Sequence, residues 1–220
     1  MNRFLQFLEK HFVPVAAKIG NQKHLLALRD GITLSMPMII IGSFFLIIAF
    51  FPYFGSNPDR QFLITSEVVR AKLLIPQEAT FGMMGLITAF GVAYRLAERY
   101  GIDAVTSGVI SLCAFLIATP FSTTITPDGM KHAITVHDVI PTEFMGSAGI
   151  FVAILVGILS TEIYRFILKK NFVIKMPDGV PTAVSKSFVA LIPGFVVLSG
   201  LSESFITGTM FFSSNLAAIL

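Results

Sequence analysis

The sequence has little charge and only one cysteine. Charged residues make up 13% of the chain, apolar residues 54%, and the mean hydropathy is +0.79. With Cys113 alone, no disulfide can form within the chain, and a lone buried cysteine usually packs as a small apolar side chain. The net charge of +3 is small and argues against a nucleic-acid-binding surface. These shortages point away from a secreted disulfide scaffold and from a nucleic-acid-binding protein.

Five long runs contain no Asp, Glu, Lys or Arg, which a soluble domain of this length would not need. A helix crosses a bilayer with about 20 mainly apolar residues. Only helices and closed barrels satisfy their backbone in lipid, and barrel strands are about 10 residues long with strict alternation. These runs are longer and apolar on all sides, so we expect an all-α polytopic membrane protein with five transmembrane helices. The runs are 31–51, 79–94, 104–127, 144–161 and 187–202.

The basic residues predict which way the chain enters the membrane. With the N-terminus placed inside, twelve Lys and Arg residues fall on the cytoplasmic side and four fall outside. Because cytoplasmic loops carry the excess of positive charge, we expect a cytoplasmic N-terminus and, after five spans, an outer C-terminus. All four tyrosines lie at predicted span ends, where their rings favour the headgroup layer: Tyr53, Tyr94, Tyr100 and Tyr164.

The segments between the runs predict smaller elements. Residues 1–24 read as a cytoplasmic amphipathic helix on the inner leaflet, with an ordinary packed helix as the alternative. Residues 53–72 are expected to form an outside loop. Residues 123–140, with Pro127-Asp128-Gly129 as the turn, predict a small extracellular β-hairpin.

Helix boundaries also leave signals in the sequence. Asp30 is a candidate N-cap for the first span, and Pro37 a candidate kink. Gly101 is expected to end the second span and Asp103 to start the third.

Three sets of polar residues are candidates for chemistry, and each has a plainer interpretation. His132 and His137, near Asp128, Asp138 and Glu143, match no zinc spacing and read as solvated loop residues. Glu162 and Glu203 are the carboxylates near membrane depth; we place Glu162 at the inner interface, and Glu203 either on an aqueous path or at the end of the fifth span. Arg95, Glu98 and Arg99 read as a solvated helix end with one i,i+3 pair. No catalytic, cofactor-binding or metal-binding residue is predicted.

Several stretches, in this order, resemble the membrane component (enzyme IIC) of bacterial sugar phosphotransferase systems, in the lactose/cellobiose branch. The resemblance covers about residues 1–198. It is carried by 4–20, 24–31 (HLLALRDG), Pro37 with 41–43 (IGS), 100–103 (YGID), 176–181 (MPDGVP), 187–188 and 191–193 (LIP).

The resemblance implies a homodimeric permease of about ten spans in two halves. The N-terminal half would form the dimer interface, and a cytoplasmic IIB phosphoprotein would phosphorylate the transported disaccharide of the chitobiose/cellobiose class. We therefore interpret residues 25–199 as the N-terminal membrane (dimerisation) domain and 200–220 as a tail without a clear match. The sugar site is expected beyond residue 220, so no substrate-binding residue is assigned here.

Two other functions remain open at this stage. The chain is alternatively half of an ion-coupled secondary transporter, or a small membrane scaffold without transport activity. Small residues in the runs independently predict close helix contact in a dimer: Gly82, Gly85, Gly146 and Gly149.

Overall fold

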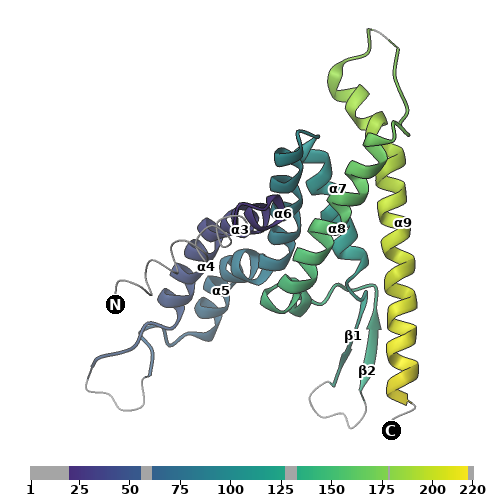
Figure 1. The fold of residues 1–220 in the computed structure, drawn as a ribbon. Helices are drawn as coiled ribbons and strands as arrows, with labels where there is room; N and C mark the ends of the chain where they lie inside the picture. Colours follow the sequence, from purple (N-terminus) through teal and green to yellow (C-terminus); the bar gives the residue numbers. More distant parts are fainter. Residues whose placement is uncertain (1–19, 56–60, 127–132, 178, 218–220) are drawn as a thin grey trace, which may run out of the picture.

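A computed structural model describes residues 20–55, 61–126, 133–177 and 179–217. The predicted amphipathic helix at 1–24 lies almost wholly outside these residues. The described chain is helical except for one two-stranded hairpin (Figure 1). Its elements are α3 (Lys23–Thr33), α4 (Met36–Ala49), α5 (Glu67–Thr80), η2 (Phe81–Met83), α6 (Met84–Tyr100), α7 (Ala104–Ile117), β1 (Ser122–Ile125), β2 (Ile134–His137), η3 (Thr142–Phe144), η4 (Ser147–Gly149), α8 (Ile150–Lys169) and α9 (Thr182–Ala217).

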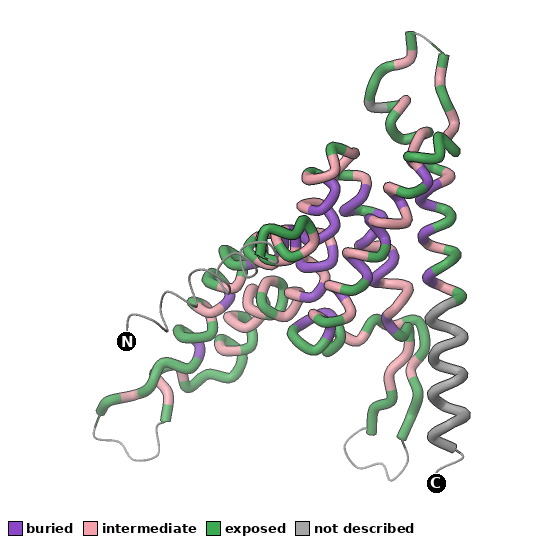
Figure 2. Tube along the Cα trace, viewed as in Figure 1, coloured by how far each residue is buried: buried purple, intermediate pink, exposed green. Residues whose placement is uncertain are grey.

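Helix α6 is the centre of a bundle. It packs against α3, α7 and α8, and α9 packs on α7 and α8. Most buried residues gather along α6, α7 and α8 (Figure 2). Polar bonds cross between these helices: the Ser111 hydroxyl donates to the Ala89 carbonyl at 2.9 Å, and the Ser107 and Thr161 hydroxyls lie 3.2 Å apart. Such interhelical bonds satisfy polar groups that lipid could not.

Helices α4 and α5 form an arm outside this bundle. They pack chiefly on each other and extend away from α6–α9 (Figure 1). Many apolar side chains of α4 are exposed, among them Ile40 at 69% and Phe44 at 65%. In a membrane, lipid or a second protein surface would cover them.

Four described segments are long and apolar enough to cross a membrane: Lys23–Ala49, Glu67–Tyr100, Ser147–Lys169 and Val184–Glu203. The prediction of a polytopic helical protein is therefore confirmed at this level, whereas a fifth span is not. The third predicted run gives only the 14-residue α7, because the chain leaves the helix after Ile117 and enters strand β1. The first two spans begin earlier than their apolar runs, and the expected loop at 53–72 is shortened because α5 begins at Glu67.

The sequence signals at the α6–α7 corner are confirmed. Gly101 takes the left-handed conformation (φ +67°) that ends α6, and the Asp103 carboxylate accepts a bond from the Thr106 N–H at 3.4 Å. Asp30, by contrast, does not cap a helix. It lies inside α3, because that helix begins seven residues earlier, at Lys23. Pro37 stands in the first turn of α4, just after a break between α3 and α4.

The hairpin lies where the sequence predicted it. Strands β1 and β2 are antiparallel, with Ser122 opposite His137 and Ile125 opposite Ile134. The turn at 127–129 lies outside the described residues. The hairpin projects from the end of the bundle opposite the 170–181 connection (Figure 1). The two connections therefore leave opposite ends of the bundle.

Three of the four glycines proposed for a dimer contact make close contacts within the chain instead, whereas a Cβ on Gly82 would have an ordinary contact with Glu78 at 3.8 Å. A Cβ on Gly85 would lie 2.8 Å from the Met145 carbonyl oxygen, and one on Gly146 would lie 3.1 Å from that of Gly82. Gly149 is closed in by Phe144 in the same way. Gly85 and Gly146 therefore pack the α6 start against the η3–η4 segment, and Gly85, Gly146 and Gly149 supply no independent argument for association.

Candidate functional site

Glu162, on α8, lies at the meeting point of three helices. Its Oε1 is 2.9 Å from His24 Nε2 of α3 and accepts the Tyr100 hydroxyl of α6. Its Oε2 accepts from Arg165 at 3.2 Å, one turn along α8. His24 and Glu162 are 138 residues apart in the sequence. We call His24, Tyr100, Glu162 and Arg165 the polar cluster.

Cations stack on the tyrosine of this cluster. The Arg165 guanidinium carbon is 3.7 Å from the Tyr100 ring centroid, and Lys23 Nζ is 5.0 Å from it. Lys23 also donates to the Arg99 carbonyl at 3.2 Å, at the C-terminal end of α6, where the helix dipole favours a cation. Both cations are close enough for the negative face of the ring to attract them.

A second ion pair ties α3 to α6 nearby. Asp30 accepts from Arg99 on one oxygen and from Arg29, at 2.8 Å, on the other. Both Asp30 and Arg99 are less than one third exposed. Asp30 and Glu162 thus each pair with at least one arginine. The two sets of contacts connect α3, α6 and α8.

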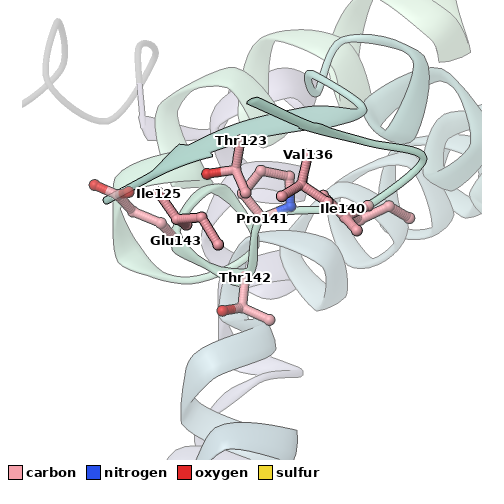
Figure 3. Close-up of a pocket in the computed structure, with 8 residues that line it drawn as sticks. Thr123, Ile125, Val136, Ile140, Pro141, Thr142 and Glu143 are labelled. Atoms are coloured by element: carbon pink, nitrogen blue, oxygen red, sulfur yellow. The ribbon is translucent and has the colours of Figure 1, made fainter. Parts of the chain in front are cut away.

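Two hollows lie beside the hairpin, at the other end of the bundle. The larger, about 460 Å³, lies between the hairpin and the segment that follows it (Figure 3). The smaller, about 240 Å³, lies between the α5–η2 junction and the η3–η4 segment. Thr142 and Glu143 line both hollows. Both are open at the surface; the larger is lined mostly by apolar and hydroxyl side chains, whereas the smaller also has the carboxylates of Glu78 and Glu143.

The match to one protein-family model shows to which family the chain belongs. The model described as "Phosphotransferase system, EIIC" matches residues 29–219. The chain is a member of the EIIC family. EIIC proteins are integral membrane proteins, which agrees with the four candidate spans.

Individual EIIC relatives are similar over most of the chain. The cellobiose-specific EIIC component of Geobacillus stearothermophilus and the lichenan permease IIC component of Bacillus subtilis (strain 168) are each 55% identical over 198 residues. The match covers 90% of this chain and 44% of each relative. The crystal structure of the transporter ChbC, the IIC component of an N,N'-diacetylchitobiose-specific phosphotransferase system, is 48% identical with a TM-score of 0.77. That match covers 89% of this chain and 45% of ChbC. The chain therefore spans less than half the length of these relatives.

The structure locates most of the charged and histidine residues that the sequence analysis named. Arg95 and Glu98 do pair at 2.8 Å, but Arg99 binds Asp30 and is not simply solvated. Glu203 is exposed on α9. His137, Asp138 and Glu143 are described, whereas Asp128 and His132 are not, and the described residues hold no group of three metal-binding side chains.

The polar cluster itself was not predicted from the sequence. His24, Tyr100 and Glu162 are far apart in the chain, and no spacing rule joins them. The nearest signal was the charge of Glu162 directly after an apolar run. Tyr164 was expected in the headgroup layer, but it is only 2% exposed and belongs to the bundle core. Its neighbour Arg165 is the residue that turns to the cluster, because adjacent helical positions point about 100° apart.

Proposed function

We propose that this chain is the N-terminal membrane half of a phosphotransferase-system permease for a β-linked disaccharide of the chitobiose/cellobiose class. The observation that carries the proposal is the likeness to ChbC, at 48% identity and a TM-score of 0.77 over 89% of the chain. The 55% identity to a cellobiose-specific component supports the same sugar class. The described residues contribute a helical scaffold rather than a sugar site.

In this proposal the chain works with two partners. Residues 25–199 act as the dimerisation domain of a homodimer, and residues 1–24 lie on the cytoplasmic leaflet. The sugar binds in the part of the permease that follows residue 220, and a cytoplasmic IIB phosphoprotein phosphorylates it. The charge on the phosphate then keeps the product from crossing the membrane again. Light scattering in mild detergent tests the dimer, since a monomeric mass at high concentration contradicts it.

A chimera tests transport directly. The matched segment of the Geobacillus cellobiose component is replaced by residues 1–198 of this chain, and labelled cellobiose uptake is measured in cells that lack their own permeases. We expect uptake that depends on the IIB protein, because more than half of the matched positions are identical. The full-length relative and the chimera without IIB are the controls. A chimera that inserts into the membrane but takes up neither cellobiose nor diacetylchitobiose contradicts the proposal.

A further inference from the structure

Each of the first two candidate spans is interrupted once. Each interruption separates a helix of the bundle from a helix of the arm. The first span breaks at Leu34–Ser35, between α3 and α4. The second changes to a 3₁₀ turn at Phe81–Met83, between α5 and α6. Helices α3 and α6 belong to the bundle, whereas α4 and α5 form the arm. A 3₁₀ stretch within a longer helix often marks a hinge.

On the bundle side of both breaks, the helices are held by close packing, ion pairs and a backbone hydrogen bond. Gly31 of α3 packs so closely on α6 that a Cβ there would lie 2.6 Å from the Val92 backbone. Asp30–Arg99 and His24–Glu162 tie the same helix to α6 and α8. Just past the second break, the Gly85 N–H donates to the Met145 carbonyl at 2.7 Å and anchors the start of α6.

The arm is tied together at its far end. Arg70 of α5 donates to the Ile64 carbonyl at 2.9 Å, and its guanidinium lies 5.6 Å from the Phe50 ring and 5.1 Å from the Phe62 ring. Backbone bonds close the same end: the Leu63 N–H donates to the Phe51 carbonyl at 2.8 Å. All of these contacts lie within the arm.

The arm is also tied together at its near end, close to the second break. A Cβ on Gly42 of α4 would lie 2.3 Å from Thr80 Oγ1 and 3.3 Å from the Phe81 nitrogen. Helices α4 and α5 are therefore joined at both ends. If the arm moves relative to the bundle, its two helices therefore move together as one body.

Open space adjoins the second break. The hollow of about 240 Å³ has Glu78, Phe81 and Gly82 on the side of the arm and the break. Across it are Thr142, Glu143 and Ser147 of the bundle. A Cβ on Gly82 would meet only Glu78, at 3.8 Å. Pro76 also removes one backbone donor from the last turns of α5.

We propose that α4 and α5 pivot as one rigid arm about the breaks at Leu34–Ser35 and Phe81–Met83. The pivot opens and closes the hollow between the α5–η2 junction and the η3–η4 segment. The bundle and the arm are each tightly packed, and two short interruptions separate them. In hinge motion, a few residues at the ends of such elements absorb the change in backbone angles. The inference rests on these contacts and does not require that the chain carry sugar.

Pulsed electron spin resonance on doubly labelled protein in bilayers tests the pivot. In a Cys113→Ser background, Phe44→Cys on α4 and Phe151→Cys on α8 report the arm against the bundle; both side chains are at least 65% exposed. Phe44→Cys with Val68→Cys is the control within the arm, and Val105→Cys with Phe166→Cys is the control within the bundle. Excess unlabelled protein restricts the signal to pairs within one chain.

We expect a broad or two-peaked distance distribution for the arm-to-bundle pair and a single narrow one for each control. Gly82→Ala, alone and with Pro76→Ala, should narrow the arm-to-bundle distribution, because both changes favour a continuous helix and Gly82 has room for a methyl group. The proposal is wrong if the arm-to-bundle pair is as narrow as the controls, if the pair within the arm is equally broad, or if neither stiffened variant narrows the distribution.

Discussion

Glu162 illustrates how an ionisable residue is accommodated within a candidate membrane span. Its carboxylate is about one third exposed and has partners on three helices. A charge-assisted hydrogen bond contributes more than a neutral one. Removing the charge also leaves Arg165, only 26% exposed, without its carboxylate. Through these contacts the residue connects α3, α6 and α8.

Replacing Glu162 by Gln should lower stability by about 1–3 kcal/mol, since bonds to a charged group are lost while the partners stay in place. Thermal unfolding in detergent, followed by size-exclusion chromatography, measures the effect. Glu98→Gln is the matched control, because the Arg95–Glu98 pair is more exposed and should contribute only about 0–1 kcal/mol. Equal melting shifts for the two variants would show that the polar cluster does not hold the helices.

Gly91 gives a second residue-level prediction. A Cβ there would lie 2.6 Å from the Gly31 carbonyl oxygen, so Gly91→Ala should push α3 away from α6 and cost about 1–3 kcal/mol. The control is Gly194→Ala in α9, whose new methyl group would have an ordinary 3.4 Å contact with Ile110. Hydrogen exchange of α3 should increase in the first variant alone. Unchanged exchange in Gly91→Ala would contradict the close crossing.

At the scale of elements, apolar length predicted that helices exist but not where they break. The first run continues unbroken through Leu34 and Ser35, and the one local sign of a corner there was Pro37, the candidate kink. In the structure, the Ser35 hydroxyl donates to the Ile32 carbonyl at 2.6 Å, and the side chain is fully buried. The hairpin and the Gly101–Asp103 corner were predictable because turn and cap chemistry is local. The polar cluster was not, because its contacts depend on tertiary packing.

The N-cap of α7 allows an element-level prediction. Asp103→Ala should cost about 1 kcal/mol, because the first turn of α7 loses its side-chain acceptor. Asp103→Ser keeps an acceptor oxygen and should retain most of that stability. Melting temperatures of the two variants, compared at the same detergent concentration, provide the measurement. A serine variant as unstable as the alanine variant would assign the effect to the charge of Asp103 instead.

At the scale of the whole molecule, orientation remains a prediction from the basic residues. We expect Thr135, on the hairpin, to face outside. We expect Lys175, in the α8–α9 connection, to face the cytoplasm, because this connection has more Lys residues than the hairpin. Both side chains are exposed. In a Cys113→Ser background, a membrane-impermeant thiol reagent should label Thr135→Cys in intact cells and Lys175→Cys only after lysis. The reverse pattern would invert the topology.

Our central hypothesis is that the two halves of the permease have different roles and that the sugar site lies outside this chain. The less exposed charges pair within the chain, and the two hollows beside the hairpin are open at the surface, so we expect no sugar site within this chain. The remainder of each relative, more than half of its length, is where we place that site.

Sugar binding by the isolated chain is the most direct test. Purified chain and the chimera with the Geobacillus component are titrated with labelled cellobiose and diacetylchitobiose in the same detergent. We predict saturable binding by the chimera and none above background by the chain of 220 residues. Saturable binding of either disaccharide to the isolated chain at micromolar concentration would contradict the account.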